Sequence, residues 1–511
     1  MIDLPLFSPY IWRGMQSAPQ PKVFFDVWKT YCFLAKKAHI HSCISIKTVP
    51  LPPKLASKSV TIHQKLASKN VSNMLTRKIY SKLVAWKERA GHKPLIIRGC
   101  RQCGKTFSVV DFANKHYEYV LYLNFFERKD LKAVFSGSIA VDDIMLNMSS
   151  ALKATKWEAG KTCIILDEIQ ECPEARAALK FFHLDGRYDV LATGSLLGVR
   201  GYREQVSSIP VGYEEHLDMY PLDFEEFLWA NGQSVEVIER LKQCLDTCTP
   251  VPEAIHLQMR KLLLHYAIVG GMPEVVNEYM NTKNLEAVLH KQRDIVETYR
   301  DDMIKYASKD VKTHIVDCFN SIPYQLAKEN KKFRYAVVKK GGRAAMYEGA
   351  LRWIEDAGII RRCYNLQTTQ LPYKGNYLPD MFKVYMVDAG LFLSMLDDGT
   401  QFDVLQGNLH IYKGAIYENL VADIFTKMGR PLYYYHKEGG IELDFLIRYH
   451  GSSTPIEVKS TNGNAKSIKT VLAHPEKYDI VQAVKLADNN VGKENGILTL
   501  PLYMAFLLTE L

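Results

Sequence analysis

GCRQCGKT, residues 99–106, is the stretch of this 511-residue chain that decides its fold. It fits the pattern GxxxxGKT of a phosphate-binding loop, but Cys100 and Cys103 also form a CxxC pair, which is typical of redox and zinc sites. The flanking sequence distinguishes the two interpretations. KPLIIR at 93–98 has the apolar run of a strand, and FSVVDFANKH at 107–116 has helical spacing. Because strand, loop and helix is the setting of a phosphate loop, we interpret the cysteines as side chains at variable positions of that loop.

Four residues of this loop have defined chemical roles. Gly99 and Gly104 allow backbone conformations and a close approach that a Cβ would block. Successive backbone amides and the helix N-terminus then point at the phosphates. We expect Lys105 to reach the β- and γ-phosphates of ATP and the Thr106 hydroxyl to contact Mg²⁺. The loop therefore predicts ATP and Mg²⁺ as cofactors.

An acidic strand end completes the chemistry that a phosphate loop requires. KTCIILDEIQ at 161–170 has an apolar run that suits a central parallel strand and ends in Asp167 and Glu168. Asp167 is expected to bind Mg²⁺, directly or through water. Glu168 is expected to be catalytic by orienting the attacking water.

The next apolar strand ends in small polar groups that suit a hydrogen bond to the γ-phosphate. In YDVLATGS at 188–195, Thr193 and Ser195 are both candidates, and Ser195 is our choice; the alternative is a plain turn after the strand. With YVLYLNFFER at 119–128, the chain has at least four strands with helices between them. This alternation predicts an α/β fold with a parallel, helix-covered sheet and a ligand at the strand C-termini.

Five segments together resemble one protein family. They are MLTRKIYSKLVAWKERAGHKPLIIRG from Met74, the phosphate loop, ILDEIQ, LATGSLLG, and YPLDFEEFLWA at 220–230. These segments are similar to the prokaryotic AAA-type P-loop ATPases that carry a C-terminal domain of unknown function. The resemblance covers the chain from Met74 to its end. It implies an AAA or RecA-like core that hydrolyses ATP, a helical lid beside the nucleotide, and assembly into a homo-oligomer.

The chain departs from that family at two places. The family usually has Pro and a small apolar residue where this chain has Cys100 and Cys103. It also has an arginine where this chain has Tyr213, so Arg200 and Arg203 become the nearby candidates for an arginine that acts on the γ-phosphate. Because a helix N-terminus can lower a cysteine pKa, we hypothesise that oxidation or alkylation of either thiol weakens ATP binding.

Charge and composition indicate an ordinary soluble protein. Of 65 basic and 56 acidic residues, 10 and 2 lie in residues 1–73, so residues 74–511 carry 55 and 54. The balanced body gives no support for DNA binding from global charge. No run reaches the ~18 to 20 apolar residues of a membrane helix, so no membrane partner is expected. The ten scattered cysteines do not form a disulfide framework, which favours the cytoplasm.

Residues 1–73 form an atypical N-terminal extension. Their basic, serine-containing and acid-poor composition is typical of an organellar transit peptide. In the interpretation that we favour, Met74 is the natural start and the preceding residues are poorly ordered.

The middle of the chain is expected to form two parts. Residues 233–315 have helical patterns, with GGMP at 270–273 as a helix stop, and correspond to the lid. Residues 316–395 change to short helices and strands, and RAAMYEGALRWIEDAGIIRRCYNL at 343–366 is typical of a winged helix. A basic cluster beside it suits DNA, a protein contact or a solvated surface. The cluster consists of Lys339, Lys340, Arg343 and Arg352.

Residues 396–511 contain a second set of reactive side chains. GGIELDFLIRYHGSSTPIEVKS at 439–460 has the pattern of two strands joined by a polar turn. The period of two places Glu457 and Lys459 on one face, and an antiparallel hairpin would bring Asp444 beside them.

An Asp followed by Glu-x-Lys is the signature of the restriction-endonuclease-like fold. This resemblance implies that Asp444 and Glu457 hold Mg²⁺ against a scissile phosphate, while Lys459 orients or activates water. Related nucleases draw an additional metal-binding acid from a preceding helix. Glu418, on an expected amphipathic helix in GAIYENLVADIF at 414–425, takes that place. The alternative is a salt-bridged strand pair without activity.

The leading hypothesis joins these parts. A Mg²⁺-dependent ATPase core at 74–232 is fused, through the lid and the winged-helix segment, to a nuclease-like domain that acts on DNA. The alternative is a nucleotide-gated regulatory protein whose C-terminal domain binds partners or DNA without cutting.

Overall fold

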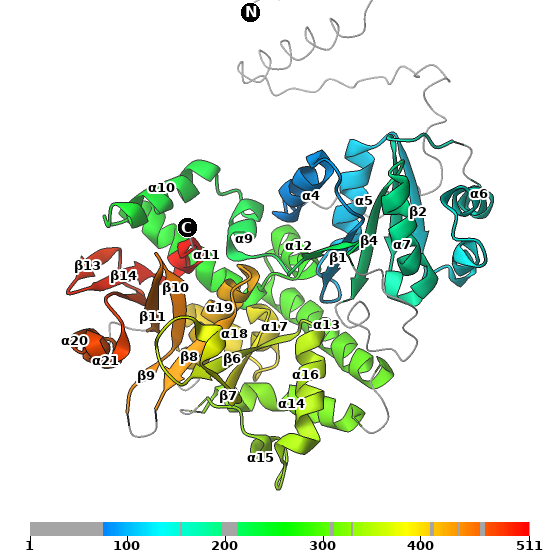
Figure 1. The fold of residues 1–511 in the computed structure, drawn as a ribbon. Coiled ribbons are helices and arrows are strands. Elements are labelled where there is room, and N and C mark those ends of the chain that lie inside the picture. The colour runs from blue at the N-terminus through cyan, green and yellow to red at the C-terminus, as the bar shows by residue number, and fades with distance from the viewer. Residues whose placement is uncertain are drawn as a thin grey trace, which may run out of the picture. The chain divides into compact units, whose positions relative to one another are not determined.

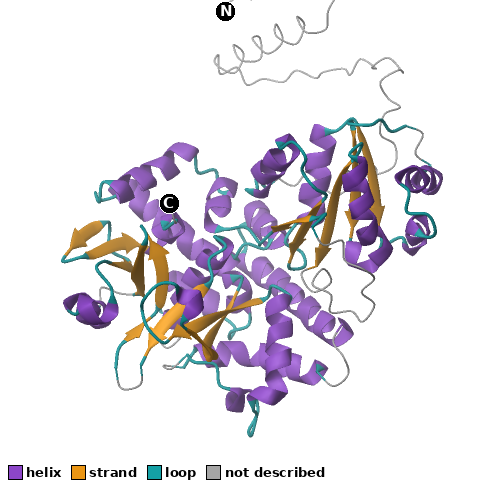
Figure 2. Ribbon diagram, viewed as in Figure 1, coloured by secondary structure: helices purple, strands orange, loops and turns teal. Residues whose placement is uncertain are grey.

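The computed structural model describes residues 75–153, 156–195, 212–306, 311–328, 331–408, 413–437, 440–459 and 465–509. The predicted N-terminal extension lies outside these ranges. By their contacts, residues Ser72–Leu511 form one unit. Its strands form three sheets; the first lies apart from the other two, which contact each other through β8 and β10 (Figures 1 and 2).

The first sheet is parallel and has the strand order β2-β3-β4-β1-β5 (Figure 1). Its strands are β1 (Leu95–Gly99), β2 (Tyr119–Asn124), β3 (Thr162–Asp167), β4 (Asp189–Ser195) and β5 (Glu215–Asp218). The helices among them are α4 (Ile79–Glu88), α5 (Lys105–His116), η1 (Lys129–Phe135), α6 (Val141–Leu152), η2 (Ile169–Glu171) and α7 (Pro173–Asp185). The predicted α/β core with a parallel sheet is confirmed.

Apolar side chains cover both faces of this sheet. All six residues of β3 are buried. Ile164 and Leu166 pack into a core with residues of α6 and α7, whereas Cys163 and Ile165 pack into another core with α4 and α5. Because side chains alternate along a strand, a continuous apolar run serves both cores.

Five helices of the described residues follow the first sheet, and all but the first of them lie in residues 233–315, the region predicted as the lid. They are α9 (Phe224–Ala230), α10 (Val235–Asp246), α11 (Glu253–Val269), α12 (Pro273–Thr282) and α13 (Leu285–Tyr306). The predicted stop at GGMP is present, since α11 ends just before Gly270 and α12 begins at Pro273. A Cβ on Gly271 would lie 2.0 Å from the carbonyl oxygen of Leu222, so glycine is required for this close approach.

The second sheet has the order β7-β6-β8-β9. The elements leading through it are α14 (Lys312–Leu326), α15 (Tyr335–Val338), α16 (Ala344–Asp356), β6 (Ile360–Leu366), η3 (Tyr373–Gly375), β7 (Tyr377–Met386), α17 (Ala389–Ser394), β8 (Leu432–His436) and β9 (Glu442–Leu443). The predicted helix and following strand are α16 and β6. However, β6 pairs with β7 antiparallel and with β8 in parallel. The boundary expected between residues 395 and 396 therefore falls within one sheet.

The third sheet has the order β10-β11-β12-β14-β13. The remaining elements are α18 (Thr400–Gln406), α19 (Lys413–Lys427), β10 (Phe445–Tyr449), β11 (Ser452–Val458), α20 (Lys466–Ala473), α21 (Pro475–Tyr478), β12 (Ala483–Ala487), β13 (Gly492–Glu494), β14 (Ile497–Pro501) and η5 (Leu502–Leu507). The prediction that α19 is amphipathic was wrong, because every residue from Ala415 to Thr426 is buried. Contacts with α17, β7, β8, β11 and η5 surround this helix.

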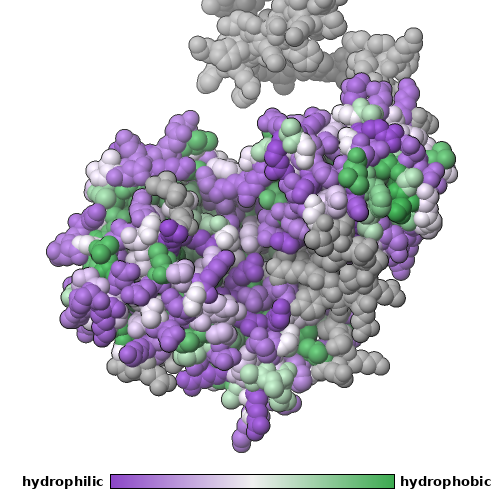
Figure 3. Space-filling model, viewed as in Figure 1, coloured by the Kyte–Doolittle hydropathy of each residue, from purple (hydrophilic) through white to green (hydrophobic). Residues whose placement is uncertain are grey.

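No helix in the described ranges is long and apolar enough to cross a membrane. On the face shown in Figure 3, hydrophilic residues cover most of the described surface and apolar patches are small.

One buried ammonium group links separate parts of the unit. Lys427 of α19 forms ion pairs with Asp423 (2.8 Å) and Asp388 (3.6 Å). It also donates hydrogen bonds to the Leu222 carbonyl oxygen (3.1 Å) and the Tyr266 hydroxyl (2.9 Å). The Lys427 side chain is 1% exposed. A charge so far from water must be paired, so these partners hold α19 to α11, α17 and the segment before α9.

Replacing Lys427 with methionine is expected to lower the apparent free energy of unfolding by about 3–5 kcal/mol, because two buried carboxylates lose their cation. Urea denaturation followed by circular dichroism measures this change. The matched control is Lys82→Met, at an exposed position of α4, which is expected to change stability by less than about 0.5 kcal/mol. Equal stability of the two variants would contradict the role given to Lys427.

Candidate nucleotide site and C-terminal carboxylate cluster

The two glycines of the phosphate loop occupy positions that a side chain would disturb. A Cβ on Gly99 would lie 2.2 Å from the Met219 carbonyl oxygen, just after β5. Gly104 has a φ of 96°, in the left-handed region that favours glycine. The close approach of the loop to β5 and its turn into α5 therefore both require glycine.

Lys105 and Thr106 begin α5 and face the C-terminal edge of the sheet. The Lys105 ammonium donates to the carbonyl oxygens of Gly99 (3.2 Å) and Cys100 (2.8 Å), and the side chain is buried. The Thr106 hydroxyl donates to Asp167 Oδ1 (2.9 Å). The structure thus brings the predicted lysine, threonine and aspartate together.

Asp167 ends β3 and accepts hydrogen bonds from four side chains. Oδ1 accepts from the hydroxyls of Thr106 and Thr193. Oδ2 accepts from the Tyr122 hydroxyl (2.7 Å) and from Asn124 Nδ2 (3.0 Å). Tyr122 and Asn124 were not among the predicted site residues, although the polar end of YVLYLN was a signal, because Asn124 pairs with Asp167 across the parallel strands. These donors hold the carboxylate in one orientation toward the loop.

Glu168 and Ser195 lie at the same edge of the sheet. Glu168 follows Asp167 with a φ of 54°, and the side-chain amide of Gln170 donates to its half-buried carboxylate. Ser195 is the last residue of β4 and lies in register with Gly99. The predicted roles of these two residues in water orientation and γ-phosphate binding remain predictions.

The arginine that would act on the γ-phosphate is not placed. Arg200 and Arg203 lie outside the described residues. Tyr213, where the resemblance implies an arginine, packs on α7: its ring centroid lies 5.9 Å from that of His183 and 5.2 Å from Lys180 Nζ. In this chain an aromatic contact therefore occupies that position.

Two residues that the sequence analysis missed hold the loop from outside the sheet. Arg77, before α4, donates to the Cys103 carbonyl oxygen (3.0 Å) and pairs with Glu226 (3.1 Å). The Tyr299 hydroxyl of α13 donates to the Arg101 carbonyl oxygen (3.1 Å). No local pattern identified either residue, because the contacts span 26 and 198 positions of sequence.

The two loop cysteines are buried and interact with each other. A hydrogen bond from the Cys100 thiol lowers the pKa of Cys103 to about 6 against the effect of burial, and the positive charges of Lys105 and Arg77 also contribute. The same hydrogen bond, together with burial, raises the pKa of Cys100. Of the two thiols, Cys103, two residues before the start of α5, is thus the one whose surroundings favour the thiolate.

The predicted C-terminal residues also come together. The register of β10 with β11 places Asp444 opposite Glu457, and Asp444 Oδ2 accepts from the Val458 amide (2.8 Å). Lys459 Nζ lies 2.6 Å from Glu457 Oε1. Burial, with the charges of Glu418 and Glu457, raises the pKa of Asp444 to about 8. The predicted hairpin is present, and the four side chains share one electrostatic environment.

Lysines from the second sheet and its preceding segment extend this cluster. Lys383 of β7 is 2% exposed and pairs with Glu442 (2.8 Å) and Glu418 (3.8 Å). Although burial opposes its charge, the two glutamates raise the pKa of Lys383. Lys331 and the Tyr385 hydroxyl both bond to Glu418. A single lysine inside the apolar run FKVYMV was the signal that the sequence analysis missed.

The carboxylates differ in how many oxygens are engaged. Both oxygens of Glu418 have partners, Oε1 with Lys331 and Oε2 with Tyr385. Among the described residues, Glu457 Oε2 is buried and has no hydrogen-bond partner. No group of three or more His, Cys, Asp or Glu in the described ranges has the arrangement of a metal site. Glu457 Oε2 is therefore a buried acceptor without a hydrogen-bond donor among the described residues. Glu418, the other predicted metal ligand, forms ion pairs with Lys331 and Lys383.

Three family models match separate parts of the chain. Residues 91–228 match an AAA domain. Residues 260–401 match a domain of unknown function, DUF8612, and residues 413–504 match another, DUF4143. The first match contains the phosphate loop and Asp167. The core is therefore an AAA-type P-loop domain, which supports nucleotide binding and ATPase activity in general.

Relatives and solved structures give weaker likenesses. An uncharacterized protein of Methanocaldococcus jannaschii is 23% identical over 393 residues, which are 74% of this chain and 75% of that protein. A Walker-type ATPase of Pyrococcus abyssi is similar at 12% identity, with 64% and 97% of the two chains covered and a TM-score of 0.39. AMPPCP-bound DnaA of Aquifex aeolicus is similar at 13% identity, with 56% and 90% covered and a TM-score of 0.27. None of these names or matched models describes a winged helix or a nuclease, so those two assignments stay predictions.

Ionisation of Cys103 predicts how thiol reagents act on nucleotide binding. Alkylation by iodoacetamide is expected to weaken ATP binding, with a rate that rises with pH through a midpoint near 6, below the ordinary thiol value near 8.5. Rates of loss of fluorescent-ATP binding across pH 5 to 9 measure this midpoint.

Two variants test the cause of the low midpoint. Cys100→Ala removes the thiol donor and is expected to move the midpoint upward, while Cys103→Ser is expected to abolish the effect. Full ATP binding after complete alkylation of Cys103 would contradict the hypothesis.

Proposed function

We propose that this chain binds ATP with Mg²⁺ at the phosphate loop and hydrolyses it as a conformational switch. The observation that carries the proposal is the Thr106–Asp167 hydrogen bond of 2.9 Å, which joins the loop to the acidic end of β3. Thr106 and Asp167 are the residues that would hold Mg²⁺, which supplies charge neutralisation at the phosphates. Their hydrogen bond supports this proposal, because it brings the two oxygens within reach of one small cation.

The chain's own side chains would perform the remaining steps. Lys105 would exchange its bonds to the loop carbonyl oxygens for charge-assisted bonds to phosphate oxygens. Glu168, half-buried and next to Asp167, would accept a hydrogen bond from the attacking water and orient it. Ser195, in register with Gly99, would bond to the γ-phosphate. The hydrogen bond from Tyr299 of α13 to the Arg101 carbonyl oxygen would then break when the loop changes with the bound nucleotide, so that α13 changes position with it.

Two substitutions separate binding from hydrolysis. Lys105→Met is expected to weaken ATP affinity by about 10- to 100-fold, because a charged hydrogen-bond donor is lost. Glu168→Gln is expected to keep ATP affinity and to lower the hydrolysis rate by about 100-fold or more. Equilibrium binding of a fluorescent ATP analogue and phosphate release measure the two quantities. Unchanged hydrolysis in both variants would refute this assignment of the site.

A second candidate function is Mg²⁺-dependent cleavage of nucleic acid at the C-terminal cluster. Two observations favour it. Asp444, Glu457 and Lys459 lie together on one hairpin. Among the described residues, Glu457 Oε2 is buried and has no hydrogen-bond partner. Asp444 and Glu457 fit a divalent cation, which would supply water activation and charge neutralisation at a phosphodiester. Glu418 fits less well, since Lys331 and Tyr385 already engage its oxygens. DNA is the proposed substrate; the alternative is a silent domain that binds partners under nucleotide control.

The two carboxylates are expected to govern metal binding. In Mn²⁺ titrations without nucleotide, Asp444→Asn and Glu457→Gln are each expected to weaken the C-terminal site by about tenfold or more, since a charged oxygen ligand is lost. Glu476→Gln, at an exposed position of α21, is the matched control and is expected to change affinity by less than about threefold.

Cleavage assays then decide between nuclease and silent domain. Branched, nicked and linear DNA are incubated with Mg²⁺ or Mn²⁺, with and without ATP. Cleavage that survives both Asp444→Asn and Lys459→Ala would place the activity elsewhere. Equal Mn²⁺ affinity in all three carboxylate variants would exclude Asp444 and Glu457 as ligands.

A further inference from the structure

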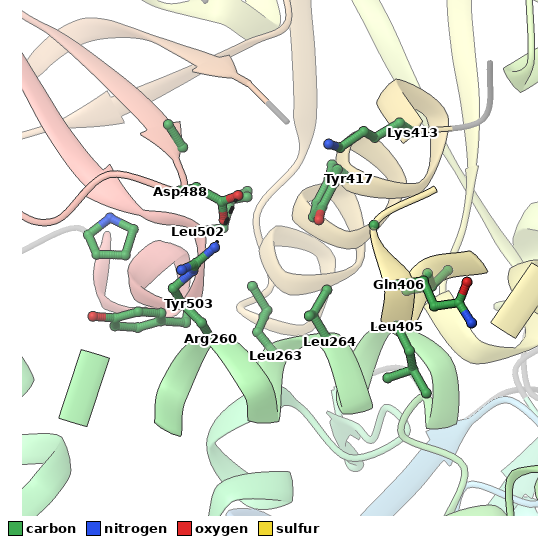
Figure 4. A pocket seen from close by; sticks show the side chains of 14 residues that line it. Arg260, Leu263, Leu264, Leu405, Gln406, Lys413, Tyr417, Asp488, Leu502 and Tyr503 are labelled. Atoms are coloured by element: carbon green, nitrogen blue, oxygen red, sulfur yellow. Dashed lines mark ion pairs between the residues drawn. The ribbon is translucent and has the colours of Figure 1, made fainter. Parts of the chain in front are cut away.

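A cavity of about 240 Å³ lies apart from both sites described above (Figure 4). Helices α11, α18 and α19 line it together with the turn from β12 and the start of η5. Its walls come from both segments that match domains of unknown function, residues 260–401 and 413–504. None of the phosphate-loop residues or the clustered carboxylates borders it. The cavity is therefore a separate feature of the C-terminal half.

One part of the cavity is apolar. Leu263 and Leu264 of α11 form its lower side in Figure 4, and Val404 and Leu502 also line it. Leu405 of α18 lines the cavity as well, and its side chain is 38% exposed. An exposed leucine beside a partly apolar hollow gains from being covered, so this side favours the hydrocarbon part of a ligand.

The opposite part carries hydrogen-bond donors and positive charge. Lys413 and Tyr417 lie one turn apart on α19, and Figure 4 shows both side chains on the same side of the cavity. Lys413 has no ion-pair partner among the described residues. Burial, with the charge of Asp488, raises the pKa of Tyr417 to about 12, so its hydroxyl remains a donor at neutral pH.

The remaining charges of the wall largely compensate one another. Arg260 of α11 pairs with Asp488 at 3.3 Å, on the side of the cavity away from Lys413 (Figure 4). With Arg260 and Asp488 paired, Lys413 carries the uncompensated charge of the lining. The lining thus presents a single net positive charge and neutral donors beside an apolar surface.

We propose that this cavity binds a small organic monoanion, a carboxylate with an aliphatic body. The carboxylate would accept hydrogen bonds from Lys413 and Tyr417, and the aliphatic body would lie against Leu263, Leu264 and Leu405. The volume, below the ~300 Å³ at which drug-sized pockets begin, favours a small ligand over a nucleoside triphosphate. A ligand here touches α11, α18 and α19 at once and so binds across the two matched segments.

Three eight-carbon probes test the charge preference on the full chain. Octanoate, octan-1-ol and octylammonium share an apolar body and differ in the head group. Isothermal titration and ligand-observed NMR are expected to show saturable octanoate binding, about tenfold weaker binding of octanol, and the weakest binding of octylammonium. Equal affinity for the three probes, or no saturable octanoate binding, would overturn the proposal.

Variants then locate the binding site. Lys413→Met is expected to weaken octanoate binding by about tenfold and to leave octanol binding unchanged, while Tyr417→Phe gives a smaller loss. Lys469→Met, at an exposed lysine of α20 outside the cavity, is the matched control. Thermal melting of each variant shows whether it folds. If Lys413→Met folds and binds octanoate as the wild type does, the assignment is wrong. If Lys469→Met also loses octanoate affinity, binding is non-specific to the surface, which would likewise overturn the proposal.

Discussion

Lys427 is the ammonium group on which the assembly of the C-terminal half depends. Its side chain is almost without solvent contact, and it is shared by Asp388, Asp423, Tyr266 and a backbone carbonyl oxygen. These partners come from α11, α17, α19 and the segment before α9. A buried charge tolerates few alternative arrangements, because each partner that it loses leaves an unpaired polar group in the core. The network therefore specifies how these elements fit together as well as adding stability.

The same network is connected to the phosphate loop by a series of contacts. Asp388 accepts from the Gly271 amide at 2.7 Å, and Gly271 in turn packs against Leu222 so closely that no side chain fits between them. Two residues further on, Pro273 begins α12 and lies near Gly104 of the phosphate loop. Tyr299 of α13 holds the loop from another direction. A change in the loop on nucleotide binding would thus act on helices that are packed into the C-terminal half, which gives the proposed switch a physical connection.

Local sequence was sufficient to identify the phosphate loop and the acidic strand end of the core. The glycines, Lys105 and Thr106 are close together in sequence, and Asp167 ends a strand that is apolar throughout, so periodicity and spacing identify them. The hairpin that joins Asp444 to Glu457 was predictable for the same reason. Lys383 and Lys331 were not predictable as partners of Glu418, because the ion pairs cross from one matched segment to the other. The prediction that α19 is amphipathic failed because the helix is surrounded on all sides and its charged residues form buried ion pairs. In the sequence, Glu418, Asp423 and Lys427 cannot be distinguished from residues of a solvent-exposed face.

The sequence by itself determined the phosphate loop, the parallel sheet around it and the acidic strand end, because all three follow from backbone geometry and side-chain alternation within short segments. It also predicted that Asp444, Glu457 and Lys459 lie together on one hairpin. Only the tertiary structure decided which of those carboxylates keep an oxygen free and which are neutralised by lysines. It also decided that Cys100, Lys105 and Arg77 lie beside Cys103 and lower the pKa of its thiol. Pairing of buried charges depends on distances between segments far apart in the chain, and those distances exist only after folding.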